Sequence, residues 1–273
     1  MDKPSLTSII ANNTEAAVKP AAETAAELTK NITAPVSNSI GQTLSDVWYL
    51  VFGGITQMAE KRRIKYGIAL QAYKTELEET LQDIPDDKRI EPNTQISMNA
   101  LEDSRNCVEE PVLRQMFCKL LSSASNSEKA SKAHPSFSSI IRRMSPFDAL
   151  LLSELSQSGA NNCPVVKFDL ELIDGSGSVT QAKNVIALNG VVKESIPEVS
   201  SSIDMLQSLG LVSVDHLRHL TDDCLYTPFE ACAYYVELSA EVARNYSDKY
   251  RVIIKRGCLD ITDLGRRFIQ CCL

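Results

Sequence analysis

The last part of the chain, from Ser145 to Leu273, constrains the fold more than any other stretch. Its pattern predicts a helix that starts at Ser145, then a strand, then a helix over 197–209. An extended segment over 211–214, a helix over 229–246, a strand over 250–255 and a last helix capped by Thr262 close the order. This order outlines a small α+β module of the winged-helix type. Modules of this type bind nucleic acid or act as docking units for other proteins.

Two local signals fix points within this module. Ser145 can cap a helix, Pro146 suits its first turn, and Asp148 follows three residues after the cap. The run from Asp174 to Gly177 reads Asp-Gly-Ser-Gly, which predicts a tight turn after a strand. It lacks the Gly-Lys-Ser/Thr ending of a phosphate-binding loop.

The preceding part of the chain is predicted to be helical. Between Met58 and Ile84, apolar residues recur at spacings of three and four, which places them on one helix face. Further helices are expected within 96–143. We therefore predict a mainly α fold with three parts: a flexible or loosely helical segment over 1–44, an antiparallel helical bundle over 45–143, and the winged-helix-like module over 144–273.

An aromatic run followed by a basic cluster is a candidate interaction or membrane surface. It comprises Trp48, Tyr49 and Phe52, followed by Lys61, Arg62, Arg63 and Lys65. Aromatic and basic residues together are typical of segments that lie on a membrane surface, although this apolar run is too short to span one. The alternative, which we prefer, is that Trp48, Leu50 and Phe52 anchor the helical core while the basic cluster faces solvent.

A second basic group lies near the C-terminus, at Lys255, Arg256, Arg266 and Arg267. In the usual docking mode of a winged helix, the helix before the wing enters the major groove. Here that helix, over 197–210, carries Glu198 and Asp204 and has no Lys or Arg. The net charge of −7 points the same way, so nucleic acid is disfavoured as a partner.

No set of residues shows the spacing of a catalytic, metal or cofactor site. His216 and His219 are separated by two residues, but a zinc site needs three or four ligands. The eight cysteines include no Cys-x-x-Cys pair, and no signal peptide precedes them, so a reducing cytoplasm is expected. We predict a non-enzymatic protein with no catalytic residues, no metal and no cofactor.

The chain resembles the bacterial abortive-infection alpha family. The segments that carry the resemblance are spread over residues 20–273: Asp46 to Gly53, Glu60 to Tyr66, Ile84-Pro85, Ile90 to Pro92, His134 to Phe137, Ser145-Pro146, Leu206 to Leu211, and Ile261 to Phe268. The resemblance implies a bacterial protein of phage resistance, in which an infected cell halts growth or dies. It supplies no catalytic residues.

Three functions follow as expectations. The first is a non-enzymatic interaction protein of phage defence, acting in the cytoplasm through contacts with a phage or host protein or with a second copy of itself. The second is an effector at the inner-membrane surface that uses residues 47–65. The third is a winged-helix nucleic-acid-binding protein, which the acidic helix disfavours.

Overall fold

The structure, a computed structural model, describes residues 42–53, 60–158, 162–193 and 195–273, without the side chains of 60–64. The chain is a mixed α+β protein with two compact units. The first unit comprises Met1–Leu150 together with Arg267–Leu273, and the second comprises Leu151–Arg266. The segment predicted over 1–44 lies almost wholly outside the described residues.

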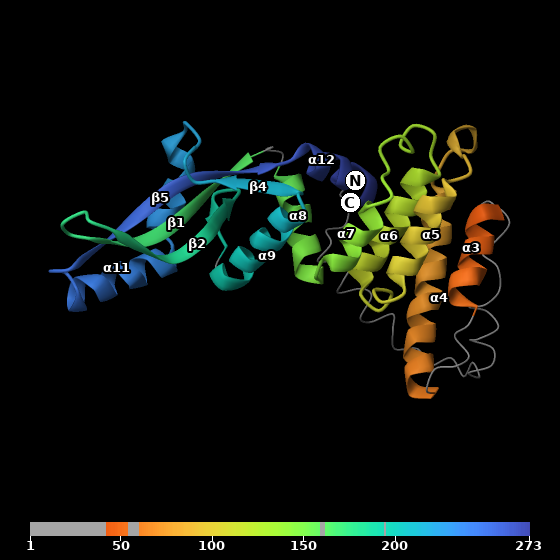
Figure 1. The fold of residues 1–273 in the computed structure, drawn as a ribbon, viewed down its shortest axis with the longest axis horizontal. Helices are drawn as coiled ribbons and strands as arrows, with labels where there is room; N and C mark the ends of the chain where they lie inside the picture. The colour runs from red at the N-terminus through yellow and green to blue at the C-terminus, as the bar shows by residue number, and fades with distance from the viewer. Residues whose placement is uncertain (1–41, 54–59, 159–161, 194) are drawn as a thin grey trace. The chain divides into compact units, whose positions relative to one another are not determined.

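The described part of the first unit is a group of packed helices (Figure 1). Helix α5 packs against α3, α6 and α7, and helix α6 also packs against α4 and α7. The bounds are α3 Gln42–Phe52, α4 Glu60–Gln82, the 3-10 helix η3 Asp86–Lys88, α5 Thr94–Ser104, α6 Pro111–Ala124 and α7 Phe137–Arg143.

The buried face of α4 carries the stripe that the sequence predicts. Tyr66, Leu70, Tyr73, Leu77 and Leu81 are all buried. They follow one another at spacings of three or four residues, which brings them onto one side of a helix. The basic residues of α4 lie near its N-terminus and its acidic residues near its C-terminus, which is opposite to what the helix dipole favours. Burial of the apolar stripe against α6 compensates for this and stabilises α4.

A buried ion pair joins α4 to α6. Arg114 donates from Nε to Oε2 of Glu76 at 2.9 Å and from a terminal nitrogen to Oε1 at 2.5 Å. The same guanidinium also donates to the carbonyl oxygen of Val108 at 2.8 Å. Because the Arg114 side chain is only 7% exposed, this pairing is what allows a charge to lie inside the unit.

The helix predicted at Ser145 is α8, Pro146–Gln157, and its start is capped reciprocally. The amide of Asp148 donates to Oγ of Ser145 at 3.1 Å, and the amide of Ser145 donates to the Asp148 carboxylate at 2.7 Å. This arrangement is a capping box, with Asp in the place of the usual Glu. The prediction of the helix start is confirmed.

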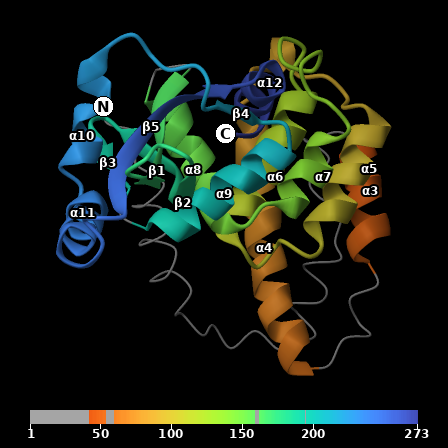
Figure 2. The same cartoon turned by 60° about the vertical axis from the view of Figure 1, so that its left-hand side comes forward.

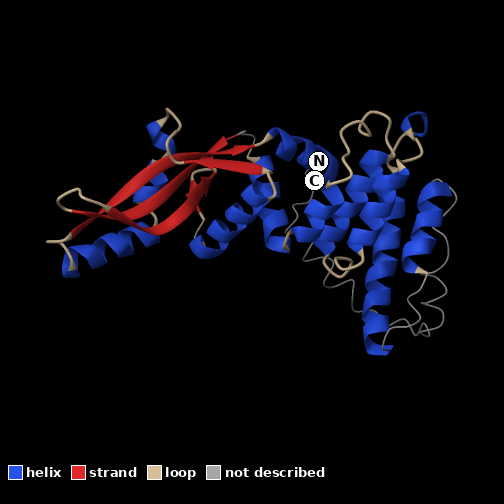
Figure 3. Cartoon of the chain, viewed as in Figure 1, coloured by secondary structure: helices blue, strands red, loops and turns tan. Residues whose placement is uncertain are grey.

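The second unit is built on a five-stranded antiparallel sheet in the order β3-β2-β1-β5-β4 (Figure 2). Its longest ladder joins β1 and β5, from the pair Asn162–Asp260 to the pair Leu172–Tyr250. The bounds are β1 Asn162–Leu172, β2 Ser178–Leu188, β3 Val191–Val192, α9 Ile196–Ser208, β4 Val212–Asp215, η4 Asp223–Leu225, α10 Thr227–Glu230, α11 Ala233–Asn245 and β5 Tyr250–Ile261. Figure 3 shows these strands in red.

The sheet is larger than the sequence predicted. Strands β2 and β3 were not expected, β5 extends six residues past the predicted end at Lys255, and the helix expected over 229–246 is divided into α10 and α11. The predicted turn after β1 is present, with Gly175 at φ 73° and the amide of Ser176 bonded to the Asp174 carboxylate. The fold is therefore mixed α+β, with more strand than a mainly α description implies. The winged-helix arrangement itself stays a prediction.

Aromatic side chains form much of the core of the second unit. Phe168 of β1 lies against Tyr234 and Tyr235 of α11, with both ring-centroid distances at 5.6 Å. Tyr226 and Phe229 complete this cluster, and the Tyr226 hydroxyl donates to the carbonyl oxygen of Gly257 at 2.7 Å. The β1–β2 hairpin and α11 are thus stabilised by packing between side chains rather than by the intrinsic strand or helix propensity of their residues.

The end of α12, Asp263–Cys272, belongs to the first unit. Its Phe268 packs edge-to-face on Phe137, with ring centroids 5.3 Å apart. The predicted module spans residues 144–273, whereas the second compact unit spans Leu151–Arg266. The two ranges differ at both ends because α8 and α12 each contribute residues to both units.

Candidate functional site

The aromatic part of the 47–65 segment is divided between core and surface. Trp48 is fully buried and Phe52 is 1% exposed, and both rings pack on Tyr73 of α4. The Trp48 and Phe52 ring centroids lie 4.6 Å apart. These two side chains are core residues, as the preferred interpretation of Trp48 predicts.

The surface part of α3 consists of Tyr49 and Leu50, which are 60% and 69% exposed. The prediction that Leu50 anchors the core is therefore wrong, because Leu50 lies on the face of α3 opposite to that of Trp48 and Phe52. Lys65 on α4 is solvent-exposed and forms an ion pair with Glu109 at 2.5 Å. The hydrogen bond with Glu109 and its charge raise the pKa of Lys65. Lys61, Arg62 and Arg63 lie in the first turn of α4, and their side chains are outside the described part.

Three of the four C-terminal basic residues belong to the second unit, and each of the three is paired with a carboxylate. Lys255 pairs with Asp169 at 2.7 Å, and Arg256 pairs with Asp223 while stacking over the Tyr226 ring. Arg266 pairs with Asp263 of its own helix. The fourth residue, Arg267, belongs to the other compact unit. In the second unit, therefore, carboxylates largely neutralise these cations.

The two histidines near β4 are not assembled with further ligands. Within the described ranges, no group of three or more His, Cys, Asp or Glu side chains is placed to hold a metal ion. Desolvation by burial, together with the charge of Lys167, lowers the pKa of His216. Its Nδ1 atom is buried without a hydrogen-bond partner among these residues.

Most of the thiols are poor nucleophiles. Burial raises the pKa of Cys163 to about 12 and that of Cys258 to about 11. Burial also raises the pKa of four other thiols, those of Cys107, Cys118, Cys271 and Cys272. A thiol with a raised pKa is protonated at neutral pH, and the thiolate is the reactive form.

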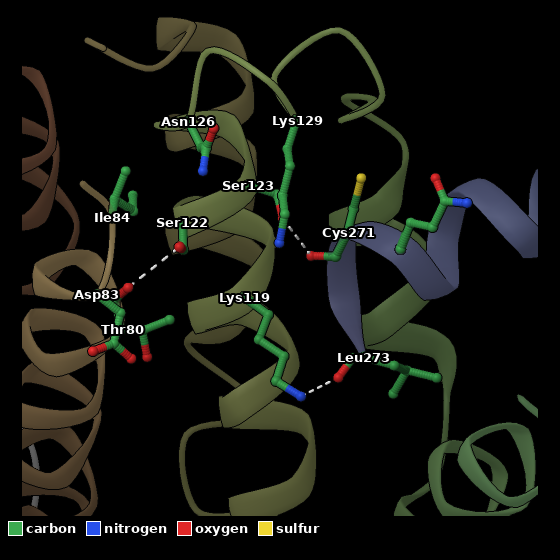
Figure 4. A pocket seen from close by; sticks show the side chains of 11 residues that line it. Thr80, Asp83, Ile84, Lys119, Ser122, Ser123, Asn126, Lys129, Cys271 and Leu273 are labelled. Atoms are coloured by element: carbon green, nitrogen blue, oxygen red, sulfur yellow. Dashed lines mark hydrogen bonds between the residues drawn. The ribbon is translucent and has the colours of Figure 1, made fainter. Parts of the chain in front are cut away.

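A pocket of about 460 Å³ lies within the first unit, where α4, α6 and α12 end (Figure 4). Three segments of sequence form its lining. These are Thr80, Asp83 and Ile84 at the end of α4, Lys119, Ser122, Ser123, Asn126 and Lys129 on and after α6, and Gln270, Cys271 and Leu273 at the end of α12.

Three hydrogen bonds hold the walls of the pocket together. Ser122 Oγ donates to the carbonyl oxygen of Thr80 at 3.3 Å, and Ser123 Oγ donates to that of Cys271 at 3.0 Å. The Lys119 ammonium donates to the backbone oxygen of Leu273. The first two bonds satisfy carbonyls in the last turns of α4 and α12, which have no partner within those helices. Figure 4 shows these bonds as dashed lines linking α6 to α4 and to α12.

Sequence reasoning missed this pocket. One signal was present in α6, where Lys119, Ser122, Ser123 and Asn126 recur at positions i, i+3, i+4 and i+7. That spacing puts polar groups on one helix face, but it is also typical of a solvated face. The other walls come from segments about forty and one hundred and fifty residues away in sequence, as the Ser122–Thr80 and Ser123–Cys271 bonds show.

Comparison with known proteins gives one match. The family model described as abortive infection alpha matches residues 65–272, which is most of the chain. No curated protein and no solved structure matches the chain. Within the described residues, no helix is both long and apolar enough to cross a membrane.

Proposed function

The chain belongs to the abortive infection alpha family, and from this premise we propose that it acts in bacterial phage defence. The match over residues 65–272 is the single observation that carries this proposal. In defence of the abortive-infection type, the infected cell halts growth or dies before new phage is released.

We further propose that the protein acts through contacts with another protein rather than by catalysis. The exposed Tyr49 and Leu50 of α3 support this, because large apolar side chains adjacent on a surface favour association. The raised thiol pKa values support it as well, since they disfavour a cysteine nucleophile. The docking-module interpretation of the C-terminal part is kept as a proposal, because carboxylates pair with Lys255, Arg256 and Arg266 and leave them less free to bind phosphate.

Phage challenge tests the defence role. Cells that express the chain should plate phage less efficiently than cells with an empty vector. A culture should survive when phage are few and stop growing when every cell is infected. Equal plating efficiency across a broad phage panel would contradict the defence role.

A substitution pair tests the contact surface on α3. Leu50→Asp should abolish protection, while Ile173→Asp should preserve it. Both residues are large apolar side chains exposed by more than half, but Ile173 lies in the turn after β1. Circular dichroism should show both variants folded. Loss of protection in both, or in neither, would reject α3 as the contact surface.

A membrane surface is the second candidate, and the same exposed Tyr49 and Leu50 favour it. Flotation with anionic vesicles separates the two. Under the protein-contact proposal, the chain stays at the bottom of the gradient. Flotation that Leu50→Asp abolishes would make the membrane the partner.

Nucleic acid is the least supported candidate. Helix α9 would be the reading helix of a winged-helix arrangement, and its Asp204 carboxylate binds Lys183 at 2.6 Å and Asn184 at 2.8 Å. Helix α9 itself has no Lys or Arg, so it offers no basic contact of its own to a phosphate backbone.

A further inference from the structure

Among the described residues of the first unit, a group of three cations has no carboxylate partner. Lys129 lines the pocket at the ends of α4, α6 and α12, and Lys132 and Arg267 lie close to its Cys271. No carboxylate oxygen of the described residues lies within 4.0 Å of Lys129, Lys132 or Arg267. In a chain with a net charge of −7, such a cluster is an unbalanced positive region.

The charges of this cluster act at the pocket wall. Burial raises the pKa of the Cys271 thiol, and the charges of Lys129, Lys132 and Arg267 oppose that rise, in this order of strength. All three cations therefore act on one atom of a lining residue. An anion in the pocket would experience the same positive field.

Helix capping does not account for these cations. Lysines often lie at helix C-termini because the carbonyls there carry partial negative charge. Here Ser122 and Ser123 already donate to the terminal carbonyls of α4 and α12. The end of α6 is closed by the amide of Ser125, which donates to Leu121 at 3.0 Å. Arg267 donates to the carbonyl oxygens of Ser131 and Lys132, each at 3.4 Å, whereas Lys129 has no such acceptor in the described structure.

The lining also suits a ligand that is more than a bare anion. The pocket volume of about 460 Å³ lies in the range of small-molecule sites, roughly 300–1,000 Å³. Asn126 and Gln270 offer amide groups to the pocket. Asp83 is the lining carboxylate, and Figure 4 places it beside Thr80 on α4, across α6 from Cys271 and Leu273. A carboxylate in that place accepts hydrogen bonds from hydroxyl groups.

We propose that this pocket binds a small phosphorylated ligand of the nucleotide class. The phosphate lies against Lys129, with Lys132 and Arg267 adding to its electrostatic attraction, and ligand hydroxyls lie toward Asp83. We commit to a small molecule rather than a nucleic acid because the pocket volume of about 460 Å³ lies in the range of small-molecule sites. The proposal does not depend on the defence role, since it is measured on the purified chain.

Calorimetry with the full-length chain at low ionic strength tests the proposal, because screening weakens exposed charges at higher salt. The probes are adenosine monophosphate, inorganic phosphate and adenosine. We expect saturable binding of adenosine monophosphate with a Kd below about 1 mM, weaker binding of phosphate, and weakest binding of adenosine. Equal binding of adenosine and its monophosphate would show that the cations do not recognise phosphate, and the proposal would fail.

Charge-neutral variants locate the site. The double variant Lys129→Gln, Lys132→Gln should weaken binding of adenosine monophosphate about tenfold or more, because charge-assisted contacts to phosphate are lost. Lys65→Gln is the matched control, since it removes an exposed charge near the opposite end of α4 and should change the Kd less than twofold. Equal losses in the two variants would show only a general charge effect and would overturn the site.

Two further results would contradict the proposal. One is the absence of saturable binding of any probe at millimolar concentration, with wild type folded by circular dichroism. The other is tighter binding of a single-stranded oligonucleotide than of adenosine monophosphate, which would make the cluster part of a nucleic-acid surface.

Discussion

Replacing Trp48 by Ala tests whether the 47–65 segment belongs to the core. Trp48 is fully buried, and its ring lies 4.6 Å from that of Phe52 and 5.4 Å from that of Tyr73, centroid to centroid. Removing a buried aromatic side chain costs about 3–5 kcal/mol, because transfer energy is lost and a cavity remains. Each aromatic contact adds about 0.5–1.5 kcal/mol beyond its buried area. We expect a loss of about 4 kcal/mol in the free energy of unfolding.

Urea unfolding followed by circular dichroism measures this loss. Tyr49→Ala is the control on the same helix, and it should change the free energy by about 0.5 kcal/mol or less because Tyr49 is 60% exposed. Since Trp48 is the only tryptophan, acrylamide quenching of wild-type fluorescence reports its burial directly. Efficient quenching, or a loss below about 1 kcal/mol, would refute the reasoning.

The vesicle experiment addresses the alternative for the same segment. Neutralising Lys61, Arg62 and Arg63 should leave both stability and vesicle association unchanged if the basic cluster faces solvent without lipid. The membrane interpretation would be correct if the wild type co-sediments with anionic vesicles and the three substitutions weaken this association without changing the free energy of unfolding.

Three other outcomes are expected. Glu76→Ala should cost about 3 kcal/mol by urea unfolding, at the lower end for a broken buried pair because Glu76 is 22% exposed, and Arg114→Met in that background should recover part of the loss. Wild type should give no salt-dependent gel shift with DNA, and Arg266→Glu with Arg267→Glu should leave that result unchanged; a shift that these changes abolish would oppose the docking proposal. Burial opposes ionisation of Asp169, but hydrogen bonds from Lys255 and two hydroxyls outweigh it and lower its pKa below 3.8. The ionised Asp169 carboxylate therefore contributes its full stabilisation above pH 3.8, and this contribution is lost as the pH falls through the lowered pKa. Asp169→Asn should flatten the fall in the free energy of unfolding below about pH 4. An unchanged fall would contradict this expectation.

Local patterns predicted the helices well. The stripe from Tyr66 to Leu81 and the cap at Ser145 depend on residues within one or two turns of each other, so the sequence carries their signal directly. The turn at Asp174 was predictable for the same reason.

The strand β2 could not be predicted in this way. The first four residues of β2, Ser178 to Gln181, are all exposed. Buried and exposed positions therefore do not alternate there, and the period-two signal of a half-buried strand is missing. Asn184 has φ 54°, a conformation that interrupts a regular strand. This strand exists because it pairs with β1, and the register shifts near Phe168 accommodate the irregularity.

The pocket could not be predicted from residues that are neighbours in the sequence, and neither could the ion pairs of the C-terminal basic residues. The partners of Lys255 and Arg256 lie 86 and 33 residues before them, at Asp169 and Asp223. Charge counted along the chain therefore suggested a patch that the fold largely neutralises. The cluster of cations without a carboxylate partner among the described residues arises instead because Arg267 returns to the unit that contains Lys129 and Lys132.

That return has a consequence for how the protein is made. A ribosome releases residues in order, so the helices of the first unit emerge long before Phe268, which packs on Phe137. Residues 151–266 must be synthesised in between, which takes roughly 6–23 s at about 5–20 residues per second. During that interval Phe137 lacks its aromatic partner and the pocket lacks a wall, so a nascent chain offers exposed apolar surface to chaperones and cannot yet form the complete pocket.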